Sequence, residues 1–312
     1  MKGPRRHHYC PAGYLANFSE PVDRHGGLVV IDRETASERP STPNNEAHQR
    51  DFYRIDTDPS VSDPFFLEKA FSDIETPALA AIRKTIDTNN LPNTEDLNWI
   101  INFIGLLFAR VPDFREKWEN FEKQIYSKIL QMSVISKAHY ESVVMKIKGG
   151  SDGPKANFEE MRDFIQGENF EIKVARNSIL TAMLQSSAIA TDLLQRRKWS
   201  LIVADCTEEF ITCDSPVIVR WIKPMRGRFA PGLGVSNTEV SLTLSPRHLL
   251  TGVFEDLSGI FNVGVEGVAS TNEYLYLKSK RWLYSRSGNP VLYNKDRIAT
   301  LKERLSCNHL RV

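Results

Sequence analysis

The sequence predicts an α+β fold, with a central helical core packed against a β-rich C-terminal half and an N-terminal β-hairpin. Three observations lead to this prediction. Apolar residues recur at helical spacing between residues 64 and 198, strand-like patterns replace them from Trp199 onward, and a glycine pair precedes the apolar run Leu28–Ile31. The chain therefore divides into residues 1–63, 64–198 and 199–312, which we expect to form one compact unit.

The first segment is rich in turn formers and poor in helical periodicity. Its run Leu28–Ile31 has the composition of a strand and predicts one arm of a hairpin. Pro40 and Pro43, with their polar neighbours, indicate an exposed loop from Glu38 to Asn45. We expect the hairpin to add strands to the C-terminal half.

The second segment predicts helices. Apolar residues at three-to-four spacing over 66–82 define one face of an amphipathic helix. Thr94, followed by two acidic residues, is a credible N-cap for a second helix that ends near Pro112. A further helical stretch has a break near 133–136, and 170–195 has the longest regular apolar stripe of the chain.

In the third segment the pattern changes to that of strands. Residues 199–204 form one predicted strand, 239–244 alternates apolar and polar residues, and 248–254 is its partner after a Ser-Pro turn. The stretch 210–221 contains another strand. It is interrupted at Asp214, because a proline two residues later removes a backbone donor.

Length and composition argue against several classes of protein. The 312 residues are 41% hydrophobic and 25% charged, as in an ordinary globular protein that can bury a sizeable core. A formal net charge of +1 provides no overall field toward nucleic acid or anionic membrane. No apolar run approaches the roughly 20 residues that cross a bilayer, and no apolar stretch follows the basic start. We therefore expect no membrane association, no signal peptide and a cytoplasmic location.

Familiar catalytic and metal-binding motifs are absent. The sequence has no G-x-S-x-G elbow, P-loop, dinucleotide-binding glycine motif or H-E-x-x-H. The four cysteines are scattered without a C-x-x-C pair, which argues against zinc-ribbon and thioredoxin-like sites. Cys206 and Cys213 could approach one another, and the alternative is two buried thiols in a reducing compartment.

His8 is the strongest single candidate for chemistry. Its imidazole titrates near neutral pH and can act as general base, general acid or metal ligand. Pro11 and Tyr14 would restrain the chain so that this side chain points one way, and we assign Tyr14 to substrate binding. The alternative is a structural histidine that bonds the backbone and anchors the N-terminal segment. The adjacent His7 is expected to face solvent.

A carboxylate and an arginine fall on two neighbouring predicted helices. Glu75 lies among apolar and small residues, where burial raises the pKa of a carboxyl group, and we assign it a catalytic role. Arg110 ends the next helix, where a cation suits the helix dipole, and its planar fork could hold the phosphate or carboxylate of a substrate. The alternative is a structural pair that joins two antiparallel helices.

Polar residues in the C-terminal half complete the candidate site. We assign Asp214 a catalytic role and Ser215 substrate binding, because a bend that breaks a strand re-aims side chains. The alternative is an Asx turn in which Asp214 bonds its own backbone. Arg247 and His248, after a Ser-Pro corner, could offer a cation, and we assign Arg247 to substrate binding. Asn272 lies among apolar residues, where it either contacts a ligand or makes a buried hydrogen bond.

Blocks along most of the chain occur in the order and spacing of a known family. They are His8-Tyr9-Cys10-Pro11 followed by Tyr14, Leu15, Asn17 and Phe18, then Leu28–Asp32, Asp51–Tyr53, Ser72–Glu75, Phe103-Ile104 with Arg110–Pro112, Phe210–Val217 and Leu242–Pro246. Together they resemble bacterial domain-of-unknown-function family 4238. This chain departs from the pattern at Ala12, Gly13 and Ala16, where bulkier or polar residues are expected. The resemblance implies a shape and candidate positions, but no reaction.

The first of three hypotheses is a cytoplasmic phosphodiester hydrolase, a nuclease of the toxin or phage-defence kind. It would use His8 as base or acid, Glu75 or Asp214 as partner and Arg110 to hold phosphate. Nucleic acid is a partner in this hypothesis, because basic and aromatic residues are mixed in a manner compatible with single-stranded nucleic acid. These residues include Arg5, Arg6, Arg196, Arg197, Lys198, Trp199, Arg226, Arg228, Phe229, Lys278, Lys280, Arg281, Trp282 and Tyr284.

The second hypothesis is a non-catalytic binding or sensor module, in which the motif residues are structural and the partner is another molecule such as a protein. The third is a metal-dependent hydrolase with a metal at His8, Glu75 and Asp214, although no local pair of ligands supports it, and the sequence leaves the cofactor open. Geometry separates the hypotheses. Catalysis needs the polar groups to converge in an open cleft, whereas a structural role leaves them paired and closed. The oligomeric state is left open by the sequence.

Overall fold

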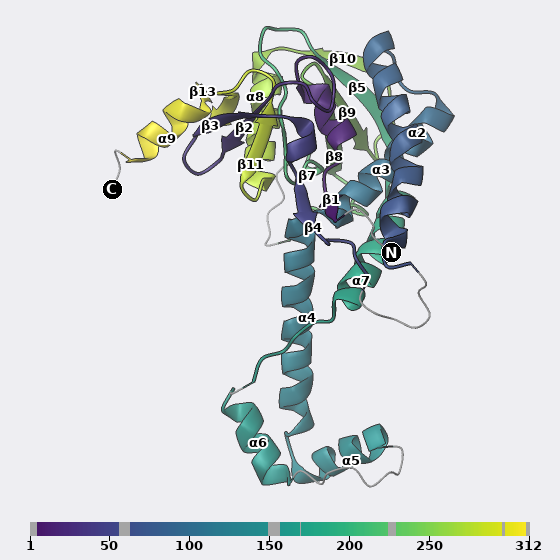
Figure 1. Cartoon of the computed structure of the whole chain (residues 1–312), viewed down its shortest axis with the longest axis vertical. Helices are drawn as coiled ribbons and strands as arrows, with labels where there is room; N and C mark the ends of the chain where they lie inside the picture. Colours follow the sequence, from purple (N-terminus) through teal and green to yellow (C-terminus); the bar gives the residue numbers. More distant parts are fainter. Residues whose placement is uncertain are drawn as a thin grey trace. The chain divides into compact units, whose positions relative to one another are not determined.

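The computed structural model describes residues 5–55, 63–148, 157–168, 170–223, 229–294 and 297–309. The predicted α+β class is confirmed, and Figure 1 follows the elements along the chain. Contacts group the chain into two compact units. Unit 1 comprises Met1–Phe114 and Met183–Val312, and unit 2 comprises Arg115–Ala182. The first and third predicted segments thus lie in unit 1, and the predicted helical segment contributes to both units.

Five strands in the described part of unit 1 form the main sheet. They are β5 (Lys198–Ala204), β7 (Ile218–Trp221), β8 (Thr238–Ser245), β9 (His248–Val253) and β10 (Ile260–Val263). Their order in the sheet is β10-β5-β9-β8-β7, and neighbours run antiparallel except for the parallel pair of β10 and β5. The predicted pairing of 239–244 with 248–254 is confirmed as β8 and β9.

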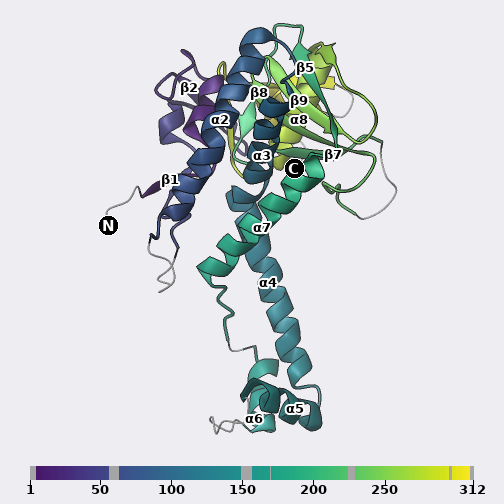
Figure 2. The ribbon, with the colours of Figure 1, turned by 90° about the vertical axis from the view of Figure 1, so that its right-hand side faces the viewer.

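Helices α2 (Phe66–Thr88) and α3 (Thr94–Arg110) pack side by side, as Figure 2 shows. The N-cap of α3 is Asn93, whose side-chain oxygen accepts a hydrogen bond from the Asp96 backbone N–H at 2.9 Å. The prediction of Thr94 as N-cap is therefore wrong by one residue. Both residue types can cap a helix, and the extended backbone of Asn93 decides between them.

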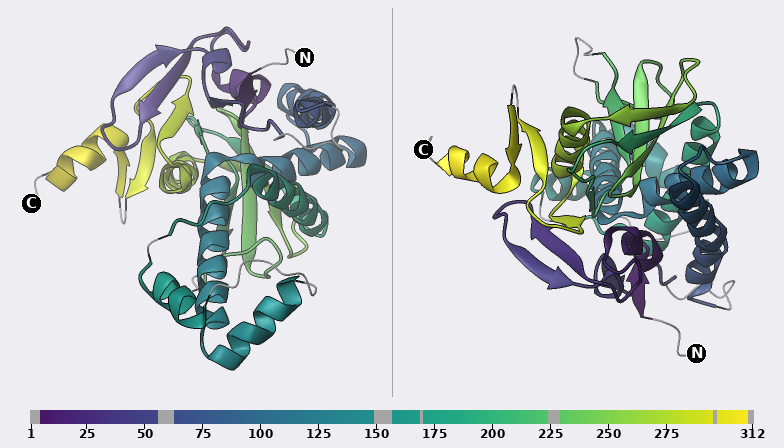
Figure 3. Two further views of the ribbon diagram at one scale, coloured as in Figure 1. Left: turned by 60° about the horizontal axis from the view of Figure 1, so that its bottom comes forward. Right: turned by 90° about the horizontal axis from the view of Figure 1, so that it is seen from above.

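The main sheet lies between α2 on one face and α8 (Val265–Lys278) on the other, an arrangement visible in Figure 3. Successive residues of a strand point to opposite faces. Leu249 of β9 packs in one cluster with Val268 of α8, whereas its neighbour His248 bonds Asn89 at the end of α2. β9 is consequently buried along its whole length.

A second sheet joins the two ends of the sequence. Its strands are β2 (Leu28–Asp32), β3 (Glu38–Ser41), β6 (Thr212–Cys213) and β11 (Trp282–Ser285), in the order β3-β2-β11-β6. The predicted N-terminal hairpin is confirmed as β2 and β3, and it joins the C-terminal half through β11. The predicted loop from Glu38 is wrong for β3. Pro40 fits there because β3 is an edge strand.

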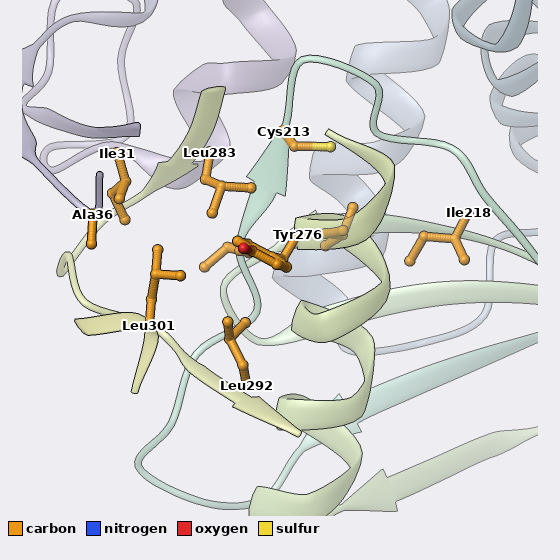
Figure 4. Close-up of a cluster of buried hydrophobic side chains, with 10 residues drawn as sticks. Ile31, Ala36, Cys213, Ile218, Tyr276, Leu283, Leu292 and Leu301 are labelled. Atoms are coloured by element: carbon orange, nitrogen blue, oxygen red, sulfur yellow. The ribbon is translucent and has the colours of Figure 1, made fainter. Parts of the chain in front are cut away.

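A buried apolar cluster holds this second sheet against α8 (Figure 4). Ile31 of β2, Leu283 of β11 and Leu275 of α8 are fully buried within it. Full burial of one such side chain contributes about 1.5–3 kcal/mol. The other buried members are Ala36, Ile211, Cys213, Ile218, Tyr276, Leu292 and Leu301. Beside the cluster, β12 (Val291–Asn294) and β13 (Arg297–Thr300) pair and lead into α9 (Leu301–His309).

The N-terminal motif belongs to the core of unit 1. β1 (Arg6–His8) pairs antiparallel with β4 (His48–Arg50), just after the short helix η2 (Pro43–Asn45). The chain then forms α1 (Ala12–Leu15) and the 3-10 helix η1 (Ala16–Phe18), every residue of which is buried. The motif is therefore an internal part of the fold.

Unit 2 contains most of α4 (Pro112–Ser133), with α5 (Lys137–Lys148), α6 (Phe158–Gln166) and the start of α7 (Arg176–Leu194). The predicted break near 133–136 is confirmed, whereas the helix predicted from residue 170 starts only at Arg176. Val134, Tyr140 and Ile165 form a buried apolar cluster in unit 2. No helix in the described part of the chain is both long enough and apolar enough to cross a membrane.

Candidate functional site

The two N-terminal histidines point to opposite sides of β1. His7 is fully buried, and its Nδ1 accepts a hydrogen bond from the Tyr53 backbone N–H at 2.8 Å. The rings of His7 and Tyr53 stack with their centroids 5.7 Å apart. The prediction that His7 faces solvent is wrong, because the pleat of the strand turns this side chain toward the core.

His8 is half-buried and already has a partner. Its Nε2 lies 3.3 Å from the carbonyl oxygen of Asn44, and its ring meets the His48 ring with centroids 5.3 Å apart. Burial lowers the pKa of His8 to about 4, and the neighbouring His48 and Arg110 act in the same direction against the opposing effect of the bond to Asn44. The imidazole is therefore neutral at pH 7.

Arg110 and Glu75 come together with the N-terminal strand. Arg110 is only 2% exposed, and all three of its guanidinium nitrogens are engaged. Nη1 donates to Glu75 Oε1 at 2.5 Å, Nη2 donates to the His8 carbonyl oxygen at 2.5 Å, and Nε donates to the Tyr53 hydroxyl at 3.2 Å. We call His8, Tyr53, Glu75 and Arg110 the N-terminal clasp. The clasp ties α2, α3 and β1 to one another through satisfied polar groups.

Tyr14 and Asn272 are fully buried and satisfied by neighbouring groups. The Tyr14 hydroxyl donates to the Thr243 carbonyl oxygen at 2.7 Å and lies 2.8 Å from the Thr212 hydroxyl. The Asn272 side chain accepts from the Ile211 backbone N–H at 3.0 Å, and its Nδ2 donates to two carbonyl oxygens of other segments. Both residues join segments of the core, as the structural alternative for Asn272 predicted.

Asp214 acts as an anchor for the start of β11. Its two carboxylate oxygens accept hydrogen bonds at 2.8–2.9 Å from the backbone N–H groups of Lys280, Arg281 and Trp282. These are backbone groups of a distant segment, so the predicted alternative of a local Asx turn is wrong. The neighbouring Ser215 has a buried Oγ for which the described residues provide no hydrogen-bond partner. No hydrogen bond or ion pair between described residues joins Asp214 to His8 or Glu75.

Arg247 lines a cavity of about 370 Å³ in unit 1. The cavity lies where the end of α2, the short helix η1, the corner between β8 and β9 and the segment after β11 meet. We call it the arginine cavity, because three arginines from three segments line it. Its lining residues are Asn17, Val22, Arg83, Ile86, Asp87, Ser245, Pro246, Arg247, His248 and Arg286.

The lining of the arginine cavity is positively charged. Its charged lining residues, three arginines and one aspartate, carry a net charge of +2 when His248 is neutral, and outside the lining the exposed Glu20 forms an ion pair with Arg286 at 3.7 Å. Burial and the nearby Arg247 lower the pKa of His248, which favours the neutral form. Arg247 donates through Nη1 to the Cys206 carbonyl oxygen, while Arg286 Nε is buried and has no hydrogen-bond partner among the described residues. A buried donor of this kind is unusual unless water or a ligand accepts from it.

Comparison with known families places the chain in one of them. The family described as "Protein of unknown function (DUF4238)" matches residues 6–289 of this chain, most of its length. The chain belongs to the DUF4238 family. No curated protein and no solved structure matches it.

Two blocks that carry the DUF4238 resemblance meet at the arginine cavity. Asn17 comes from the N-terminal block, is 5% exposed and lies on η1. Ser245 and Pro246 end the block Leu242–Pro246 and form the corner between β8 and β9. The family resemblance therefore leads to two places in the fold, namely the closed clasp and this open cavity.

The basic and aromatic residues predicted to bind nucleic acid divide into exposed and buried ones where the structure describes them. The exposed ones are Arg5, Arg6, Arg196, Lys198, Phe229, Lys280 and Arg281. Trp199 and Tyr284 are 3% and 0% exposed and cannot stack on a base. Arg197 is buried and donates to backbone carbonyl oxygens, including that of Thr238 at 2.7 Å. Phe229 is 84% exposed. The patch at Arg226 and Arg228 lies outside the described residues.

No group of three His, Cys, Asp or Glu side chains among the described residues is placed to hold a metal ion. Cys206 and Cys213 are both free thiols. Arg247 and His248 are the cation predicted after the Ser-Pro corner, whereas Arg83 and Arg286 are not predicted from the sequence. Arg83 and Asp87 at helical spacing on α2 are a weak signal, and no local pattern distinguishes Arg286.

Proposed function

We propose that this DUF4238 protein is a binding module for a phosphate ester, which it holds in the arginine cavity. The observation that carries the proposal is the convergence of Arg83, Arg247 and Arg286 on one cavity. Its volume of about 370 Å³ lies in the range of small-molecule sites. Guanidinium groups match the oxygens of phosphate through paired hydrogen bonds.

Charge and shape both favour this class of ligand. The net charge of +2 complements the dianion of a phosphate monoester. The buried Nε of Arg286 has no acceptor in the part of the chain that the structure describes, so a phosphate oxygen would remove the free-energy cost of leaving this donor unpaired. Val22, Ile86 and Pro246 line the same cavity and would contact the organic part of the ester.

The N-terminal clasp has a structural role in this proposal. His8, Glu75 and Arg110 are paired with one another or with backbone, and Asp214 is saturated by backbone N–H groups. Phosphodiester hydrolysis through His8 stays a prediction, as do the cytoplasmic location, the nucleic-acid partner and the toxin or phage-defence role. Nuclease activity that persists in His8→Ala would contradict the His8 mechanism.

Binding of phenylphosphonate tests the proposal, because its phosphorus–carbon bond resists hydrolysis. Isothermal titration should show saturable binding to the wild type. Loss of one charge-assisted hydrogen bond costs about 1.5–3 kcal/mol, so Arg83→Gln and Arg286→Gln should each bind at least about tenfold more weakly. Arg162→Gln, an exposed position in unit 2, is the matched control. Absence of saturable binding, or equal affinity in all variants, would refute the proposal.

A further inference from the structure

The arginine cavity contains a serine and a histidine in hydrogen-bond contact. Ser245 Oγ lies 2.8 Å from His248 Nδ1, and both residues line the cavity. On the far side of the imidazole, His248 Nε2 lies 3.1 Å from the side-chain oxygen of Asn89. This order of a hydroxyl, an imidazole and an orienting side chain is that of an activated nucleophile.

The bond to Asn89 determines which nitrogen of His248 carries the proton. An amide oxygen can only accept, so Nε2 must donate to Asn89 Oδ1. The neutral ring then has a lone pair on Nδ1, which accepts the Ser245 O–H. Burial and the neighbouring Arg247 both favour this neutral form. His248 is thus oriented to remove a proton from Ser245.

A purely local explanation accounts for only part of this arrangement. Ser245 begins the turn between β8 and β9, and its Oγ also accepts from the Arg247 backbone N–H at 3.2 Å, as serine does in many turns. A turn does not require the His248 imidazole to be held by Asn89 at the end of α2. Nor does it require the hydroxyl to line a cavity with three arginines.

We propose that Ser245 is the nucleophile, His248 its general base and Asn89 a positioning residue in the hydrolysis of a phosphate monoester bound in the arginine cavity. This inference rests on the proposed binding function and extends it to a reaction. It also moves the predicted hydrolase chemistry from the clasp to the corner between β8 and β9.

The reaction has two balanced halves. Ser245 Oγ attacks phosphorus as its proton passes to His248 Nδ1, the bond from phosphorus to the ester oxygen breaks, and the leaving alcohol takes that proton. Water then attacks the phosphoserine, His248 accepts a proton from the water, and Ser245 regains it as inorganic phosphate leaves. The arginines of the cavity would stabilise the charge on the transferred group.

The first test measures release of p-nitrophenol from p-nitrophenyl phosphate together with the intact mass of acid-quenched protein. The wild type should turn over and gain the mass of one phosphoryl group, located on Ser245 by peptide mapping. Ser245→Ala should lose the adduct and at least about 100-fold in turnover, and His248→Gln should lose a similar factor. Circular dichroism and phenylphosphonate binding of both variants show whether they are folded.

Asn89 permits a second test that a merely structural role would not pass. Its backbone is left-handed, with φ of 52°, so Asn89→Gly keeps the conformation and removes only the amide. We expect kcat to fall with little change in KM. Asn89→Asp restores an acceptor for Nε2 and should restore kcat.

The outcomes separate this inference from the proposed function. A wild type that binds phenylphosphonate but shows neither turnover nor a phosphoryl adduct would overturn the inference and leave the binding function standing. Absence of binding would overturn both. Unchanged turnover in folded Ser245→Ala would also overturn the inference.

Discussion

At the scale of single residues, helices α2 and α3 carry one buried and one exposed ion pair. Arg110 and Glu75 are 2% and 20% exposed, with Nη1 and Oε1 2.5 Å apart. Lys84 and Asp96 are 58% and 20% exposed, with Nζ and Oδ2 2.6 Å apart. The two pairs have similar distances, so burial is the main difference between them.

Burial predicts very different effects of breaking these two pairs. Arg110→Ala removes the partner of Glu75 and of the His8 carbonyl oxygen, and it should lower the free energy of unfolding by about 3 kcal/mol. Lys84→Ala should change it by less than about 1 kcal/mol. Urea denaturation measures both, and equal losses in the two variants would show that Arg110 has no special role in stability.

His8 predicts a dependence of stability on pH. Its folded pKa of about 4 lies below the usual value of 6.5, so the unfolded chain binds a proton first as the pH falls. The contribution of His8 to the free energy of unfolding is therefore fully present above pH 6.5. It is lost as the pH falls toward 4, because the unfolded chain gains a proton that the folded chain does not bind. One proton accounts for at most about 1.4 kcal/mol per pH unit. Between pH 7.5 and 4.5, the free energy of unfolding measured in urea should fall less steeply for His8→Gln than for the wild type. Equal slopes would contradict the lowered pKa of His8.

At the scale of elements, internal periodicity was sufficient to predict helices and strands but not their ends. The predicted helix over 66–82 is part of α2, and the predicted strand over 199–204 is β5. Ends depend on individual caps and contacts, as Asn93 shows at α3. The prediction that His7 of β1 faces solvent is wrong, because a shift of one residue in a strand reverses its buried and exposed sides.

Asp214 should stabilise the start of β11, because it accepts hydrogen bonds from three backbone N–H groups there. Asp214→Asn retains one acceptor oxygen for three backbone N–H groups, so it should cost about 2 kcal/mol of unfolding free energy. Hydrogen exchange should become faster over residues 280–285. Asp23→Asn is the control, because Asp23 Oδ1 accepts a hydrogen bond from the His25 backbone N–H at an exposed site. Unchanged exchange over residues 280–285 in Asp214→Asn would contradict the anchoring role of Asp214.

At the scale of the whole molecule, the two units differ in how much they bury. Helix α4 has no buried residue among those described, whereas every residue of β9 is buried. Segments with few buried apolar side chains open more readily than core strands. Backbone amides over 116–133 should therefore exchange faster than those over 249–253. Native-state hydrogen exchange followed by mass spectrometry measures this, and equal protection would indicate a single cooperative unit.

The candidate site was predictable only in part. The pairing of Glu75 with Arg110 follows from two amphipathic helices and their charges, and the structure contains this ion pair. The arginine cavity could not be predicted, because Arg83, Arg247 and Arg286 lie far apart in the sequence. No local periodicity relates residues that are brought together by sheet pairing and helix packing.

The α+β class, the positions of most elements and membership of the DUF4238 family can be predicted without coordinates, because they depend on local periodicity and on blocks spread along the chain. Tertiary structure alone decided which polar groups are closed and which face a cavity. The side chains of His8 and Asp214 are bonded to backbone groups of distant segments, which no local pattern could indicate. Ser245 and His248 became a candidate site because the end of α2 packs against the corner between β8 and β9.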